Sequence, residues 1–490
     1  MDGTLFQLVK DVTTDNLKDA MQQAIEIEIA TIPVYLFTYY SIKRTQNQSQ
    51  LQQTIFNDFK TSQKLKKNPI SDTELDEAAE TLARYIMVFA NKAGALIMSV
   101  AIEEMLHMAL SSNIKNALGK YGGLPELVNK TPKVWPAYLP GHIPSFPINR
   151  AKLSLDQLHT FLLIESPLPF TDGGHEKGAV IEYQTIGKYY DMIIDCIKNN
   201  LKDSDFDGKA PQLISSQYYN QNNIDTIYYD KDHKPQFANG NHSGGLIHVK
   251  SIDTALEAMH EIIEQGEGAS HTTKDEKKKI GNHLTTDGKV VCPMDDKFNP
   301  LSYDDKEKDE LSHFDKFLDI YCSIERENAK IEKFLGVDSF DFTKYFVKNL
   351  PENPKTSDYP EAIQKISNLT NAIYTYLFIM TEACYKTDGH KQFEIFMFGI
   401  HKSMIWLLDN LAGTMSGLTY INPSGQLSNV SVTFEDYPFN RSTSPKSQII
   451  ALAKEAMSVG NTIGQVIMNR IQDLPDVPLE SYLENQSATN

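Results

Sequence analysis

Apolar residues recur three or four positions apart along much of the chain, which is the pattern of helices with one buried face. Four long stretches show this spacing most clearly: 14–40, 72–118, 252–265 and 306–334. The second stretch ends before Gly119, and glycine commonly follows the end of a helix. Pro33 lies inside the first stretch and is expected to kink that helix or open its hydrogen-bond ladder. The pattern predicts a mainly α-helical protein built around four long helices.

The segments between these helices are polar or rich in proline. Six prolines lie between positions 125 and 147, and the crossover that contains them, 120–250, holds a further helical pattern at 179–199. Residues 43–71 are polar, and 270–305 have the composition of an exposed insertion. We expect the insertion at 270–305 to be exposed.

A C-terminal region follows the predicted bundle. Two apolar stretches, 362–386 and 393–414, predict helices that flank the bundle, and 449–471 predicts a last amphipathic helix. The alternation Val-Ser-Val-Thr-Phe at 430–434 predicts one short strand. The predicted organisation is a bundle over 14–335, with its long crossover and insertion, and a helical extension over 336–490 packed on it.

Composition and charge narrow the class of partner. Of the 490 residues, 41% are hydrophobic and 23% are charged, as in ordinary soluble globular proteins. The net charge of −17 disfavours nucleic acid and anionic membranes, because both require basic patches. The first residues lack a basic segment followed by an apolar run, so no secretory signal is expected. Charge, glycine or histidine interrupts the apolar helices, and we expect none of them to span a membrane.

The cysteines indicate the compartment. The chain has four cysteines, which are far apart and form no C-x-x-C pair: Cys196, Cys292, Cys322 and Cys384. A zinc ribbon or a dithiol redox motif is therefore not expected. Dispersed cysteines are typical of a reducing environment, and we expect a cytoplasmic protein.

Two Glu-x-x-His pairs are the most informative feature of the chain. They are Glu104 with His107 and Glu310 with His313. Each pair places a carboxylate and an imidazole one turn apart on one helix face. Two such pairs, with one glutamate from each of two further helices, hold a pair of iron or manganese ions in four-helix bundles. The sequence contains no G-x-S-x-G motif or P-loop, so serine hydrolase and nucleotidase functions lack support.

The apolar faces of the first two helices select the ligand candidates. Glu28 continues the apolar face of the first helix, whereas Glu26, two positions away, cannot share that face. Glu104 and His107 lie on the apolar face of the second helix. Glu103 is rotated from Glu104 by about 100° and is expected to support the site from outside or to lie at the surface. A carboxylate on an apolar face is costly unless it is paired or bound to metal. The alternative is therefore a set of buried ion pairs.

The third helix offers three glutamates, Glu261, Glu264 and Glu267. We prefer Glu267 as the ligand because it is the next inward position after Ile263. Glu264 shares a polar face with Glu257 and remains the alternative.

The fourth helix carries Glu310 and His313 just before two phenylalanines, Phe314 and Phe317. Glu310 could equally be an ordinary acidic residue at a helix N-terminus. Three further histidines are expected to be structural or to support the ligands: His260, His390 and His401.

Two segments resemble the signature helices of the ferritin-like iminophenyl-pyruvate dimer synthase family. They are 25–36 (IEIEIATIPVYL) and 101–109 (AIEEMLHMA). Shorter similarities follow in the same order, at 139–141, 161–167, 185–187, 265–268 and 312–314. The resemblance covers about residues 14–420. Ile29, where a polar residue often stands in that family, and the insertion at 270–305 depart from its pattern.

This resemblance implies a fold, a site and a reaction. The fold is a ferritin-like four-helix bundle, and the implied metal site comprises Glu28, Glu104, His107, Glu267 and His313. Members of the family couple oxidised aromatic amino-acid imines in violacein and indolocarbazole biosynthesis, so a partner oxidase could supply the reactive imine.

Two functions follow from the predicted site. The leading hypothesis is a metal-dependent oxidoreductase of secondary metabolism, with one or two iron ions, or manganese or another divalent metal, and a small aromatic substrate derived from an amino acid. The alternative is a non-catalytic ferritin-like protein that binds or stores metal.

Overall fold

The structure is a computed structural model, and it describes residues 8–9, 11–139, 146–166, 186–214, 245–267, 289–292, 312–458 and 463–479. The helices of the first part of the chain are α1 (Leu17–Tyr40), α2 (Gln48–Gln63), α3 (Asp72–Ala117), α4 (Leu155–Ile164), α5 (Ile186–Asn200), α7 (Ile252–Glu267) and α9 (His313–Leu335). A two-stranded antiparallel sheet, β1 (Ala137–Tyr138) with β2 (Pro147–Ile148), lies before α4. Short 3-10 turns occupy Gly119–Tyr121 and Asp203–Asp205.

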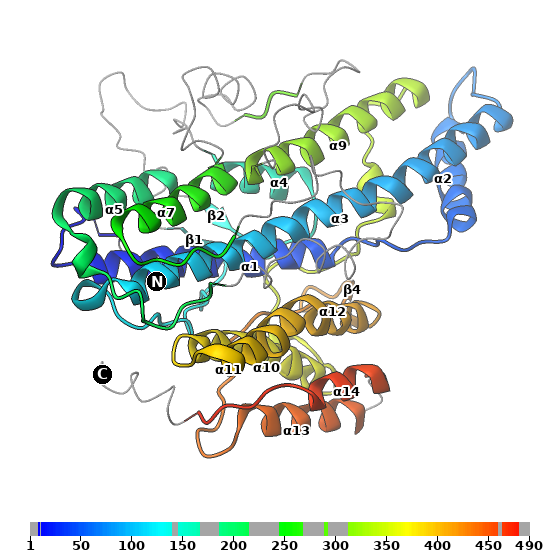
Figure 1. The fold of residues 1–490 in the computed structure, drawn as a ribbon. Coiled ribbons are helices and arrows are strands. Elements are labelled where there is room, and N and C mark those ends of the chain that lie inside the picture. Colours follow the sequence, from blue (N-terminus) through cyan, green and yellow to red (C-terminus); the bar gives the residue numbers. More distant parts are fainter. Residues whose placement is uncertain are drawn as a thin grey trace.

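The second part of the chain forms another helical layer. Its helices are α10 (Glu361–Cys384), α11 (Gly389–Glu394), α12 (Leu408–Ser416), α13 (Pro445–Ser458) and α14 (Gln465–Gln472). Two π-helical segments, Ile395–His401 and Ser403–Leu407, lie between α11 and α12. A hairpin of β3 (Thr419–Ile421) and β4 (Leu427–Asn429) follows α12. Figure 1 shows the α10–α14 layer beneath α1 and α3. The mainly α-helical, bundle-type fold predicted from the sequence is confirmed.

Local sequence explains where the longest helix begins and ends. Ser71 caps α3 by accepting a hydrogen bond from the backbone N–H of Glu74, whose carboxylate accepts from the backbone of Ser71 in return. At the other end, Gly119 has a φ of +53°, in the left-handed region that favours glycine. α1 remains one helix through Pro33.

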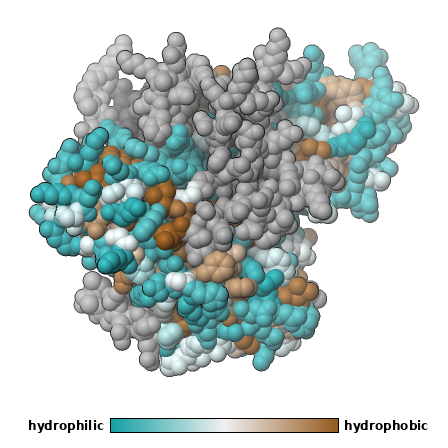
Figure 2. All heavy atoms as spheres, in the orientation of Figure 1, coloured by the Kyte–Doolittle hydropathy of each residue, from teal (hydrophilic) through white to brown (hydrophobic). Residues whose placement is uncertain are grey.

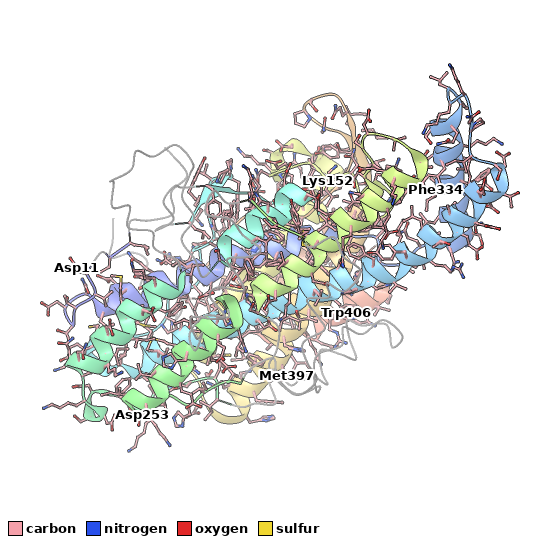
Figure 3. The ribbon with its side chains drawn as sticks, turned by 90° about the horizontal axis from the view of Figure 1, so that it is seen from above. Asp11, Lys152, Asp253, Phe334, Met397 and Trp406 are labelled. Atoms are coloured by element: carbon pink, nitrogen blue, oxygen red, sulfur yellow. A yellow bond between two sulfur atoms is a disulfide. The ribbon has the colours of Figure 1, made fainter. Side chains whose placement is uncertain are left out.

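The bundle has four rows, each formed by one long helix or by two shorter helices placed end to end. Two of the four rows are of the second kind. α1 and α3 are continuous and pack against each other. In Figures 1 and 3, α7 and α9 follow one another along one line beside α3, and α5 and α4 form the fourth row in the same way. We expected 252–265 and 306–334 to be two separate rows, and that arrangement was wrong. A helix of 46 residues such as α3 is about 69 Å long, so one partner row needs both the 16-residue α7 and the 23-residue α9.

Other boundaries also differ from the sequence predictions. The polar segment 43–71 contains α2, which buries a narrow stripe of Leu51, Ile55 and Phe59. The residues at 430–434 form no strand, although Val430, Val432 and Phe434 are buried. The amphipathic stretch at 449–471 forms two helices, α13 and α14, rather than one.

α9 begins at His313 because Ser312 caps it. The Ser312 hydroxyl accepts a hydrogen bond from the backbone N–H of Asp315, and Ser312 itself has extended backbone angles. Glu310 and the rest of 306–311 lie outside the described residues, so the predicted role of Glu310 stays a prediction.

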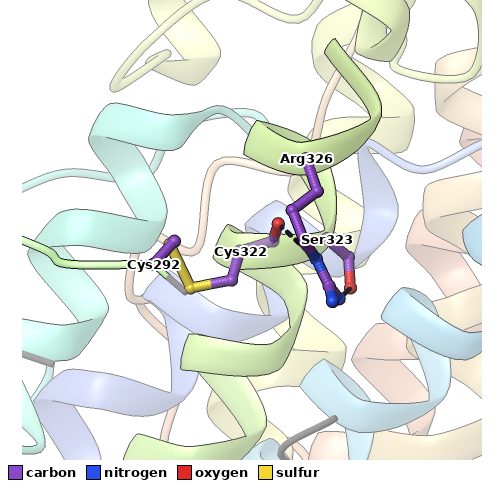
Figure 4. The surroundings of a disulfide bond; sticks show 4 residues. All are labelled: Cys292, Cys322, Ser323 and Arg326. Atoms are coloured by element: carbon purple, nitrogen blue, oxygen red, sulfur yellow. Dashed lines mark hydrogen bonds between the residues drawn. A yellow bond between two sulfur atoms is a disulfide. The ribbon is translucent and has the colours of Figure 1, made fainter. Parts of the chain in front are cut away.

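Cys292 and Cys322 form a disulfide, with their Cα atoms 5.3 Å apart (Figure 4). The bond ties the short segment 289–292 to the middle of α9. The expectation of four free cysteines was wrong for this pair, because residues 30 positions apart in sequence meet in space. Cys196 and Cys384 are free and buried. Disulfides are uncommon in reducing compartments, so the cytoplasmic location stays a prediction that this pair does not favour.

One described helix, α3, is long and apolar enough to cross a membrane by length and composition alone. We had expected none. However, 72% of its most apolar stretch is buried inside the protein, as in the central helix of a helical bundle. Where Figure 2 colours the described residues, their surface is mostly hydrophilic, with some hydrophobic patches.

Candidate metal centre

Four glutamates and two histidines meet inside the bundle. They lie close to the two places where one short helix ends and the next begins, between α7 and α9 and between α5 and α4. Each of these side chains is at most 4% exposed as a residue: Glu28, Glu103, Glu104, His107, Glu165 and His313. They come from the middle of α1, the second half of α3, the end of α4 and the first residue of α9. One oxygen or nitrogen atom from each of Glu104, His107 and His313 can be chosen so that all three lie within 4.8 Å of one another.

Glu28 lies between a histidine and a tyrosine. The Tyr190 hydroxyl on α5 donates a hydrogen bond to Glu28 Oε1 at 2.6 Å, and Glu28 Oε2 is 3.7 Å from His107 Nδ1. Ser111 shares a second hydrogen bond with Tyr190. Glu26 instead pairs with Lys130 at 2.8 Å near the surface. The sequence therefore predicted correctly which of the two α1 glutamates faces inward.

Glu104 is fixed from two sides. Thr31 on α1 donates a hydrogen bond to Glu104 Oε2 at 2.7 Å. Glu104 Oε1 lies 3.0 Å from His313 Nδ1. The helical phase predicted for α3 thus places Glu104 and His107 in the same cluster.

Each histidine turns Nδ1 toward Glu28 or Glu104, whereas its Nε2 faces a different residue. His107 Nε2 is 3.0 Å from the Gln265 amide oxygen, and the Gln265 nitrogen donates to Glu261. His313 Nε2 is 2.9 Å from Glu103 Oε2. Because both partners offer an acceptor, Nε2 can keep its proton in each ring, and Nδ1 can offer a lone pair inward once its own proton leaves. The two rings stack with their centroids 5.3 Å apart.

Glu165 completes the cluster, and sequence reasoning missed it. It caps the C-terminus of α4, and its Oε2 lies 3.4 Å from His313 Nδ1. The Tyr35 hydroxyl donates a hydrogen bond to its other oxygen. A signal was present in the sequence, because Glu165 ends the apolar run Phe-Leu-Leu-Ile within 161–167.

The structure distinguishes between the ligand candidates predicted on the third helix. Glu264 is exposed, which disfavours it as a ligand. Glu267 is the last residue of α7, and its side chain lies outside the described residues, so its predicted role is untested. Gln265 is the α7 residue that contacts the cluster. Outside the cluster, His401 is buried elsewhere, in a π-helical segment.

Glu103 is buried rather than at the surface. Both of its oxygens accept hydrogen bonds from Lys316 Nζ, at 2.8 and 2.6 Å. The surface alternative considered for Glu103 was therefore wrong. Glu103 is buried beside His313, and its supporting role stays a prediction.

Burial and close charges shift the protonation of the whole cluster. Burial is the main cause that raises the pKa of Glu104 to about 8, opposed by His313 and reinforced by the negative charges of Glu28 and Glu165. Burial also acts to raise the pKa of Glu28, but His107 outweighs it and the pKa is lowered. Burial acts to lower the pKa of His313, but the charge of Glu165 and the contacts with Glu103 and Glu104 raise it well above its ordinary value. Without a cation, protons must therefore offset the buried carboxylates.

The donor set fits a transition metal. Carboxylate oxygen and imidazole nitrogen suit Fe(II), Mn(II) and similar ions. The cavity between the ligand candidates has a volume of about 20 Å³, which is room for an ion or a water molecule but not for an aromatic ring. Its other walls include apolar residues at the start of α5 and the end of α7, Ile186, Ile262 and Ile263.

Comparisons with known proteins found a similar solved structure and a matching family model. A crystal structure of a ferritin-like protein from Caulobacter vibrioides is similar to 81% of this chain and 97% of its own, with 16% sequence identity and a TM-score of 0.35. No curated protein matches the chain. The family model named Ferritin-like matches residues 21–322, which is more than half of the chain and contains every residue of the cluster. The chain therefore belongs to the ferritin-like family.

Proposed function

We propose that this protein is a metal-dependent oxidoreductase that holds one or two iron ions at the buried cluster. The observation that carries the proposal is the convergence of two histidine Nδ1 atoms with Glu28, Glu104 and Glu165. His107 and the three glutamates line one small cavity. Three buried carboxylates without a cation would repel one another, and binding a divalent ion removes that cost. Manganese fits the same donor set.

The residues around the ligands have distinct tasks in this proposal. Tyr190, Thr31 and Tyr35 each donate a hydrogen bond to one carboxylate, which fixes its orientation before an ion binds. The protons held on Glu104 and the histidines leave when an ion binds, so affinity rises with pH. A bound iron ion would supply redox chemistry and a Lewis acid.

The substrate class is the finer part of the proposal. We propose oxidation or oxidative coupling of a small aromatic molecule derived from an amino acid, such as an imine that a partner oxidase supplies. The resemblance of 25–36 and 101–109 to the iminophenyl-pyruvate dimer synthases supports this class. Because the cavity itself is too small for an aromatic ring, the substrate would approach the ion from the side of Ile186, Ile262 and Ile263.

Metal analysis and a turnover assay test the proposal together. Protein from iron- and manganese-replete expression should contain one or two metal ions per chain by elemental analysis. An oxidase should consume O₂ when an amino-acid oxidase generates iminophenyl-pyruvate or its indole counterpart in the same vessel, and mass spectrometry should show a changed product distribution. Loading of many irons per chain without turnover would instead indicate storage, and protein that takes up no metal would overturn the proposal.

A further inference from the structure

The strongest contact outside the metal cluster is a buried ion pair that touches one of the proposed ligands. Glu103 on α3 and Lys316 on α9 are both fully buried and joined by two hydrogen bonds. The same Glu103 oxygen that accepts from Lys316 at 2.6 Å lies 2.9 Å from His313 Nε2. Three charged or polar side chains thus form a chain that ends at a ligand candidate.

Helix geometry explains why the three groups meet. His313 and Lys316 are three positions apart on α9, so they lie one above the other on the same face. Glu103 and Glu104 are adjacent on α3 and point in directions about 100° apart. His313 is therefore placed between two neighbouring carboxylates, with Nδ1 toward Glu104 and Nε2 toward Glu103.

We propose that the Glu103–Lys316 pair is a positioning device that fixes the orientation and tautomer of His313 for metal binding. An ionised carboxylate only accepts hydrogen bonds, so Glu103 requires a proton on Nε2 and leaves the Nδ1 lone pair free to face the ion. A carboxylate behind a ligating imidazole also makes that imidazole a stronger donor to the metal. Lys316 donates a hydrogen bond to each oxygen of Glu103 and so fixes the carboxylate on the Nε2 side of His313.

The inference rests on the proposed metal site and adds two residues to it. It predicts an effect on metal binding that exceeds any effect on folding. Replacing both members of a buried ion pair by apolar residues of similar size is often neutral or stabilising, because no unpaired charge remains. The double variant E103M/K316M removes the device in this way, while all five proposed ligands stay in place.

A second ion pair between the same helices provides a matched control. Lys92 on α3 and Asp319 on α9 lie 2.5 Å apart, and Asp319 is buried, yet neither residue has a contact with His313 among those described. The double variant K92M/D319L should therefore lose an ion pair between α3 and α9 without changing the metal site.

The experiment measures the affinity of metal-free wild-type and variant protein for Zn(II) and Co(II) by competition with a chelator. E103M/K316M should bind each ion about 10- to 100-fold more weakly than wild type, whereas K92M/D319L should stay within about twofold. E103Q keeps an acceptor beside Nε2 and should fall between them. Thermal melting of the metal-free proteins checks that each variant folds.

A spectroscopic measurement separates positioning from a general structural effect. In Zn(II)-loaded wild-type protein labelled with ¹⁵N-histidine, NMR should show histidines with a protonated Nε2 and a metal-bound Nδ1. The signals of one of these histidines, His313, should change in E103M/K316M but not in the control variant. Equal affinity and an unchanged tautomer in E103M/K316M would overturn the inference and leave the metal site intact. Wild-type protein that binds neither ion would overturn the proposed function as well.

Discussion

Replacement of Glu104 by glutamine should make the metal-free protein more stable at neutral pH while weakening its metal binding. Glutamine is nearly the same size as glutamate and can accept the hydrogen bond from Thr31 that Glu104 accepts at 2.7 Å. Its amide can also face His313, which lies 3.0 Å from Glu104 Oε1. The variant therefore removes the ionisable group and keeps the shape of the site.

The size of the effect follows from the pKa of Glu104. Burial raises that pKa from 4.5 to about 8, so the unfolded chain releases the Glu104 proton at a lower pH than the folded protein does. A carboxyl with a raised folded pKa makes the protein less stable as the pH rises from the unfolded value to the folded value. At pH 7 the penalty is about 3 kcal/mol, since each pKa unit corresponds to about 1.4 kcal/mol. Glutamine has no such penalty.

Thermal unfolding of metal-free protein measures this difference. With an unfolding entropy of about 2 cal/mol/K per residue, about 3 kcal/mol corresponds to a rise in Tm of about 3 °C for a chain of this length. The Tm difference between E104Q and wild type should grow by about that amount between pH 4.5 and pH 7. Glu80→Gln, on the exposed part of the same helix, is the control and should show no such growth. A Tm difference that is the same at both pH values would refute the argument that Glu104 holds a proton in the folded state.

Three further substitutions test the site. His107→Ala should remove most bound metal, measured by elemental analysis, because it deletes one of the two inward-facing nitrogens; full metal content would exclude His107 as a ligand. Glu165→Gln should weaken Zn(II) binding at least tenfold in chelator competition, whereas Glu26→Gln, whose partner is Lys130, should not; equal effects would remove Glu165 from the ligand set. Glu267→Gln should lower turnover more than Glu264→Gln, which changes an exposed residue. The reverse order would show that we chose the wrong inward-facing glutamate at the end of α7.

Most of the cluster residues that the sequence predicted lie on α1 and α3, and a further one, His313, begins α9. α1 and α3 contain many apolar positions, so the sequence defines their inward faces well. Glu28, Glu104 and His107 could be predicted because they lie on those faces. Glu165 could not be placed in this way. It ends a helix of only 10 residues inside a proline-rich crossover, where too few apolar positions define a face.

The hydrophobic pattern of the sequence could not predict features that depend on which helices pack against each other. Periodicity shows which face of a helix is buried but not which helix covers it, so the end-to-end arrangement of α7 and α9 was not predicted. The Cys292–Cys322 disulfide was missed for the same reason, because its two residues are 30 positions apart in sequence and meet only in the folded protein. Lys316 was also missed as a partner of Glu103, because a lysine on an amphipathic helix usually faces water.

The position of the cluster where short helices meet end to end has a consequence for how the protein matures. The candidate ligands extend from residue 28 to residue 313, and no two helices bring more than three of them together. If the protein holds an ion as proposed, a partly folded chain offers that ion only weak, incomplete coordination, and metal capture would be a late event that selects correctly assembled molecules. An ion at a thousand times its dissociation constant would stabilise that assembled state by about 4 kcal/mol. Metal supply during synthesis should thus set the yield of native protein as well as its activity.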